Sequence, residues 1–151
     1  MPPKNPPEKS GIKERLLAGI DLIDASQACA LLRIETAVPE AAMQGMARDD
    51  AIIILMRNGK TMVPLFQFDT ANGRVFSVVR DILRLRPARI SNLRLCYWLN
   101  RVHVDFRCAP AQRFGHDDLA IVAAFRRYKP CKLSWSPMHV NRPHIFKSLK
   151  R

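Results

Sequence analysis

The fold is decided by a short stretch near the middle of the chain, residues 51–63, which reads AIIILMRNGKTMV. Its first half is apolar and rich in β-branched residues, and Thr61-Met62-Val63 resumes the same extended pattern. Asn58-Gly59 stands between the two runs and favours a two-residue hairpin turn, because both residue types tolerate positive φ angles. The stretch therefore predicts a β-hairpin with Arg57 and Lys60 at its tip.

Apolar residues at helical spacing precede this hairpin. The periodicity predicts a helix over residues 12–23, a second over 25–32 and a third from 39 to about 47. Asp24 or Ser26 can cap the second helix. Helix, helix, turn, helix and hairpin follow one another in the order of a winged helix-turn-helix.

The second half of the chain is predicted to be helical. Apolar spacing and helix-ending residues favour helices over 75–85, 91–100 and 119–128, with a short helical turn over 110–114. Ser91 can cap the second of these helices. Trp98 is expected to be buried between these helices. The expected fold class is mainly α with a small β-hairpin: an N-terminal winged helix-turn-helix followed by a C-terminal helical domain.

These elements predict four segments along the chain. A proline-rich start suggests a flexible arm over residues 1–11, and the winged helix-turn-helix-like domain would span 12–69. A helical, dimerisation-type domain would span 74–128, and a basic tail would follow over 129–151. The tail interleaves bases with aromatic residues, so it could bind nucleic acid or serve only as a solvated extension.

The charge of the chain is high and unevenly distributed. Its 151 residues carry 25 Lys and Arg against 13 Asp and Glu, a formal net charge of +12. Residues 16–73 hold four bases and seven acids, whereas 74–128 hold eleven bases and four acids and 129–151 hold six bases and no acid. A balance this basic indicates an anionic partner, most commonly nucleic acid.

Several short stretches of the sequence occur in an order that resembles a known family. They read DASQACALLRI at 24–34, VPLFQFD at 63–69 followed by GRV at 73–75, LCYWLN at 95–100 and APAQRF at 109–114. The order resembles the Xre/MbcA/ParS-type antitoxins, which pair with RES-domain toxins, and related small winged helix-turn-helix DNA-binding proteins. The resemblance covers roughly residues 20–128. It implies a dimer that represses its own operon and covers the active site of a RES-type toxin.

The candidate DNA contacts lie on the third helix and the hairpin. In a helix-turn-helix the second helix of the pair enters the major groove, where Gln pairs with adenine and Arg with guanine. Thr36, Gln44 and Arg48 are the candidate groove contacts, and Arg57 and Lys60 would hold phosphate at the hairpin tip.

Two further bases and three acids bear on this prediction. Arg80 and Arg84 share one face of a predicted helix and would contact DNA phosphate or an acidic protein surface. Three acids near the third helix, Glu40, Asp49 and Asp50, would face a polyanion. A helical corner used for packing or dimerisation therefore stays open as an alternative.

Other site classes find little support in the sequence. Cys131, His139 and His144 have ligand chemistry but lack a zinc-site spacing and a fourth ligand, so no metal is expected. The chain has no glycine-rich phosphate loop and no nucleophile with a clear base partner, so we expect no catalysis and no cofactor. Four cysteines without a C-x-x-C pair, no secretory signal and no apolar run of membrane-spanning length predict a cytoplasmic protein with reduced thiols and no membrane contact.

The sequence thus predicts a sequence-specific transcriptional regulator of the antitoxin-like type that binds double-stranded DNA as a homodimer. Two alternatives stay open. One is a protein-interaction module that neutralises a partner toxin, and the other is a structural or partition-type DNA binder that reads little sequence.

Overall fold

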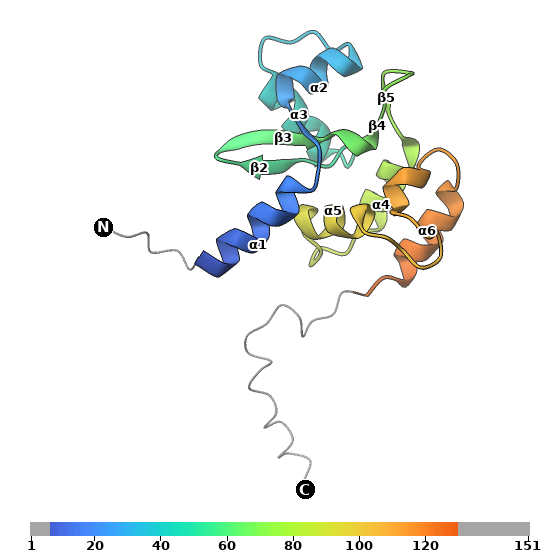
Figure 1. The fold of residues 1–151 in the computed structure, drawn as a ribbon. Helices are drawn as coiled ribbons and strands as arrows, with labels where there is room; N and C mark the ends of the chain where they lie inside the picture. The colour runs from blue at the N-terminus through green and yellow to red at the C-terminus, as the bar shows by residue number, and fades with distance from the viewer. Residues whose placement is uncertain (1–6, 130–151) are drawn as a thin grey trace, which may run out of the picture.

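A computed structural model of the chain describes residues 7–129, and in it helices predominate over two small antiparallel sheets (Figure 1). The helices are α1 (Pro7–Ala18), α2 (Ala25–Leu32), α3 (Pro39–Arg48), α4 (Ser77–Leu85), α5 (Asn92–Asn100) and α6 (Asp118–Arg127). The strands are β1 (Leu22–Asp24), β2 (Leu55–Arg57), β3 (Lys60–Pro64), β4 (Phe68–Asp69) and β5 (Arg74–Val75). Single 3-10 turns, η1 (Leu65–Gln67) and η2 (Pro110–Arg113), complete these elements.

The predicted hairpin is confirmed. β2 and β3 pair antiparallel around Asn58 and Gly59, whose φ angles of 53° and 78° are the positive pair that this tight turn requires. The sheet is larger than predicted, because β1 pairs with the other edge of β3 and gives the strand order β1-β3-β2. A second pair, β4 with β5, follows the hairpin.

The helix predicted over residues 12–23 is wrong at both ends. α1 begins at Pro7, inside the segment predicted to be a flexible arm, and it ends at Ala18 before Gly19. Residues 22–24 leave the helical path and form β1, because Leu22 pairs with Pro64 in the distant strand β3. Helical spacing cannot reveal a strand partner some forty residues away. The basic tail, apart from Lys129, lies outside the described residues.

Two predicted caps are present. The Asp24 carboxylate accepts a hydrogen bond from the Gln27 backbone N–H at 2.7 Å, and the Gln27 side chain accepts from the Asp24 N–H at 2.9 Å. This reciprocal pair satisfies donors at the start of α2 that the helix itself leaves unpaired. Ser91 caps α5 by accepting from the Arg94 N–H at 3.1 Å.

The apolar side chains form two clusters that meet along residues 52–55. Ile52 belongs to the cluster under α2, α3 and β3, whereas Ile53 and Leu55 belong to the cluster that unites α1 with α4, α5 and α6. Successive side chains therefore enter opposite cores, as the period of two in an extended chain requires. Leu17 of α1 and Ile20 just after it belong to the second cluster, so α1 packs with the C-terminal helices.

The side chain of Gln67 stabilises the segment along which the two clusters meet. It is fully buried, and its Oε1 accepts from the Ile53 N–H at 2.8 Å while its Nε2 donates to the Ile53 carbonyl at 2.8 Å and the Pro64 carbonyl at 3.1 Å. Asn92 donates to the Ile54 carbonyl at 2.8 Å. Residues 52–54 belong to neither sheet, so these side chains satisfy backbone groups that a strand partner would otherwise pair.

Trp98 is buried between the C-terminal helices, as predicted. Its ring centre lies 5.3 Å from that of Phe125 on α6 and 5.6 Å from that of Tyr128. These tilted aromatic contacts are of the kind that stabilise a core beyond the burial of area alone.

Replacing Gln67 by Ala should lower the free energy of unfolding by about 3 kcal/mol, because three buried backbone groups lose their partner. Urea denaturation measures this loss. Gln112→Ala is the matched control, since the exposed Gln112 accepts only from the Ala109 N–H, and it should cost less than about 1 kcal/mol. Equal losses for the two variants would contradict the role given to Gln67.

Candidate nucleic-acid interface

α3 is fixed to the hairpin by three polar side chains. Glu40 on α3 accepts from the Thr61 backbone N–H at 3.0 Å, and its second oxygen lies 3.4 Å from the Thr61 hydroxyl. Gln44, one turn further along α3, donates from Nε2 to the same hydroxyl at 3.1 Å. Thr61 is fully buried, so helix and strand are joined through a polar contact that excludes water.

The position of Thr61 in the sheet explains why it needs this contact. Arg57 and Lys60 flank the two-residue turn, so Thr61, the next residue of β3, directs its N–H away from β2. β1 does not reach it there, because Asp24, the last residue of β1, pairs with Met62. Glu40 takes the place of the missing strand partner. The hairpin and α3 thus behave as one unit.

This contact decides where Gln44 lies. Gln44 is half-buried against β3, and its Nε2 is already hydrogen-bonded to Thr61. Its prediction as a base-reading residue is untested, but only the atoms that Thr61 leaves unoccupied could reach a base. Thr36 is exposed ahead of α3, and its hydroxyl accepts from the Val38 N–H at 3.0 Å, which shapes the entry to the helix.

The outward face of α3 carries small side chains and one basic residue. Ala41 and Arg48 are exposed, Gly45 lies between them on the same face, and Val38 just before the helix is 57% exposed. A Cβ built on Gly45 would meet only the end of the Arg48 side chain, at 3.7 Å. A helix face without bulky side chains allows a close approach to another surface.

The two predicted bases of the hairpin tip are exposed. Arg57 and Lys60 flank the turn, and Arg57 lies 3.9 Å from Glu14 of α1. Both members of this pair are largely exposed, so the attraction between them is weak and leaves Arg57 able to exchange Glu14 for a stronger anion.

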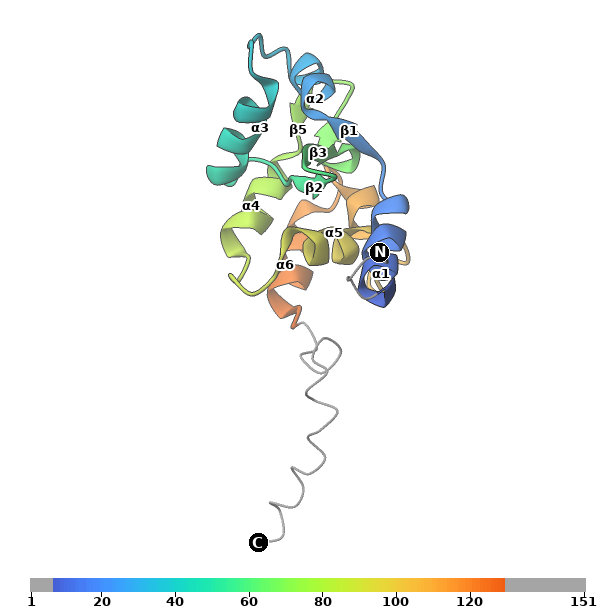
Figure 2. The same ribbon diagram turned by 90° about the vertical axis from the view of Figure 1, so that its left-hand side faces the viewer.

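Arg80 and Arg84 extend this surface onto α4. Both are exposed, and neither forms an ion pair with another described residue. α3 and α4 lie on the same side of the molecule, at the left in Figure 2, and a pocket of about 360 Å³ between them is lined by Met46, Ala51 and the start of α4. The exposed Asp81 reduces the positive potential there.

Four other arginines of the C-terminal half have partners within the protein. Arg74 pairs with Asp69, Arg113 with Asp117 and Arg127 with Asp105. Arg86 donates to the side chain of Asn92. The exposed bases at α3, the hairpin tip and α4 are Arg48, Arg57, Lys60, Arg80 and Arg84.

Within residues 7–129, no group of three or more His, Cys, Asp and Glu side chains is placed to hold a metal ion. The sequence predicts no metal at Cys131, His139 and His144, and these residues lie outside that range. No helix in the described range is long and apolar enough to cross a membrane. Among residues 7–129 three cysteines are free thiols, of which Cys29 and Cys96 are buried and Cys108 is half-buried.

The chain matches no protein-family model, and no curated protein or solved structure shows significant similarity to it. A proposal for its function therefore rests on the arrangement of residues just described.

Glu40→Ala should lower the free energy of unfolding by about 2 kcal/mol, because the buried Thr61 N–H would lose its acceptor. Glu40→Gln should cost less, since its amide oxygen can still accept. Urea denaturation compares these variants with Glu35→Ala, a change at an exposed carboxylate that should have little effect. A Glu40→Ala variant as stable as Glu35→Ala would contradict the contact.

The thiols should differ in reactivity. Burial raises the pKa of Cys96 to about 12 and also raises the pKa of Cys29, so both remain protonated near neutral pH. In a Cys131→Ser variant, an aromatic disulfide reagent at about pH 8 should modify Cys108 first and Cys96 only after unfolding. Modification of Cys96 in the folded protein as fast as Cys108 would show that its burial is incorrect.

Proposed function

We propose that this protein is a sequence-specific, DNA-binding transcriptional regulator of the antitoxin-like type that acts as a homodimer. The observation that carries the proposal is the unit of α2, α3 and the hairpin, in which Glu40 and Gln44 hold α3 against Thr61. Its connectivity, helix, strand, helix, helix and hairpin with the order β1-β3-β2, is the one expected of a winged helix-turn-helix.

Each basic side chain of this surface has a proposed role. The small outward face of α3 would enter the major groove, where Arg48 would contact a guanine edge and Thr36 would lie at the groove entrance. Gln44 would mainly position α3, with its remaining amide atoms available to a base. The hairpin-tip bases Arg57 and Lys60 would contact phosphate.

The α4 arginines, Arg80 and Arg84, would extend the phosphate contact beyond the groove. A single short helix reads few base pairs, which is why a two-fold dimer on a symmetric site is part of the proposal. Such a protein would bind double-stranded DNA through many weak charge contacts and a few specific ones.

The second candidate is a module that neutralises a RES-type toxin. Three large apolar side chains outside the DNA surface support it, since Val102, Val104 and Leu119 are 70%, 83% and 89% exposed and available to a protein partner. The test is co-expression with a RES-domain toxin. Rescue of growth that Val104→Asp with Leu119→Asp abolishes, with DNA binding unchanged, would support this function.

The first test uses Gly45, because a side chain fits there without displacing the backbone. Gly45→Glu places a negative charge on the outward face of α3 and should weaken binding to a duplex of about 30 base pairs by about tenfold or more. Gly45→Ala is the matched control and should bind as the unchanged protein does, with a slightly higher stability. Fluorescence anisotropy measures the affinities. Equal binding by both variants would refute the placement of DNA at α3.

The second test separates phosphate contacts from base contacts. Arg57→Ala with Lys60→Ala should weaken binding to every sequence alike and reduce the slope of log affinity against log salt by about 2, because each phosphate contact contributes about 0.9. Arg48→Ala should instead change the sequences recovered by selection from random DNA. An unchanged slope, or identical selected sequences, would contradict the assigned roles.

A further inference from the structure

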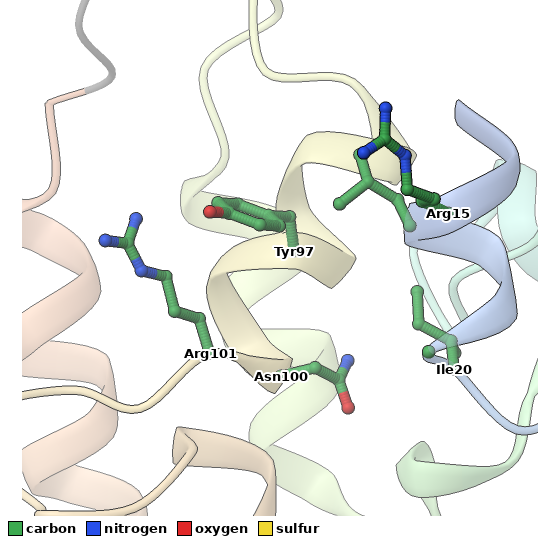
Figure 3. A pocket seen from close by; sticks show the side chains of 7 residues that line it. Arg15, Ile20, Tyr97, Asn100 and Arg101 are labelled. Carbon is green, nitrogen blue, oxygen red and sulfur yellow. The ribbon is translucent and has the colours of Figure 1, made fainter. Parts of the chain in front are cut away.

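A pocket of about 240 Å³ lies between α1 and α5, on a surface to which the DNA proposal gives no role (Figure 3). The side chain of Tyr97, 40% exposed, forms one wall, and Arg15 and Ile20 of the α1 segment form the other. α1 and α3 lie at opposite sides of the molecule in Figure 2, so the pocket lies away from the outward face of α3.

Two guanidinium groups flank the Tyr97 ring. The Arg101 guanidinium lies 5.4 Å from the ring centre, and Figure 3 shows Arg15 on the other side of Tyr97. No ion pair of the described residues includes Arg15 or Arg101. Arg15 donates only from Nε, to the Gly11 carbonyl at 3.4 Å, which leaves both of its terminal nitrogens for an anion.

The remaining lining supplies an apolar floor and one polar acceptor. Ile20 is buried beneath the pocket, and Gly19 beside it contributes no side chain. Asn100 donates from Nδ2 to the Cys96 carbonyl at 2.8 Å, so its Oδ1 is left to accept a hydrogen bond from a ligand. The pocket thus combines a flat aromatic surface, positive charge without acidic partners and an acceptor.

We propose that this pocket binds one nucleotide unit, a planar base joined to a phosphate. The base would stack on Tyr97, whose ring already accepts the planar Arg101 group, and the phosphate would bind the terminal nitrogens of Arg15. Asn100 Oδ1 would accept from an amino group of the base. Free nucleotides and an unpaired nucleotide of a single strand share this chemistry.

Isothermal titration of the full chain with adenosine monophosphate tests the site. We expect a dissociation constant of about 1 mM or lower, and binding at least about tenfold weaker for inorganic phosphate alone, because phosphate cannot stack. Tyr97→Leu and Arg15→Gln should each weaken nucleotide binding by about tenfold. Gly19→Leu should abolish it by filling the pocket, since only backbone oxygens 3.7 and 3.8 Å away face a Cβ there.

Gly11→Leu is the matched control for Gly19→Leu, because it adds the same side chain to α1 where nothing lies within 4 Å.

A short single-stranded oligonucleotide distinguishes a free nucleotide from a nucleotide of a single strand. If it binds with the same sensitivity to Tyr97→Leu and Gly19→Leu while the free nucleotide does not, the ligand is a strand. Equal affinity for inorganic phosphate, indifference to Tyr97→Leu, or no binding of either probe would overturn the proposal. The Gly45→Glu variant should bind nucleotide normally, so failure here and failure of DNA binding at α3 are independent.

Discussion

The amide of Gln67 forms hydrogen bonds with both backbone polar groups of Ile53, at the point where two hydrophobic clusters meet. An extended segment that is buried on both faces needs partners for its N–H and C=O groups, and here no strand supplies them. One side chain does so instead. Because residues 52–55 send alternate side chains into the two clusters, this contact fixes the register in which the hairpin emerges between them.

The hairpin in turn determines how α3 is presented. Thr61 lies where β1 has ended, and the α3 carboxylate of Glu40 pairs with its N–H while Gln44 pairs with its hydroxyl. The polar side of α3 is therefore turned inward, and the outward side keeps small residues and Arg48. A helix of this kind allows a close approach to another surface and contributes a single positive charge. Affinity for an anionic partner would then depend on bases of neighbouring elements, namely the hairpin tip and α4.

Local signals in the sequence predicted local structure well. Asn58-Gly59 predicted the turn through its positive φ angles, and Asp24 and Ser91 predicted helix starts through their side-chain acceptors. The error in the helix predicted over residues 12–23 comes from a contact between distant segments, because Leu22 pairs with Pro64 and forms β1. The inward position of Gln44 also depends on a distant residue, since Thr61 is a buried polar partner that looks like an ordinary strand residue in the sequence.

The nucleotide-sized pocket has the same origin in distant contacts. Arg15 lies in α1 and Tyr97 lies in α5, far apart in the sequence. Only the packing of α1 against the C-terminal helices brings them together. Nothing local in the sequence indicated that α1 would lie beside Tyr97.

In the proposed complex, α3 and the hairpin tip together would face a duplex. The decisive experiment is a titration of the isotope-labelled full chain with duplex DNA, followed by amide chemical shifts. We expect the largest shifts for Ala41, Gly45 and Arg48, for residues 57–60, and for the exposed side of α4. Shifts confined to α6 and the loop over 101–109, with α3 and the hairpin unchanged, would contradict it.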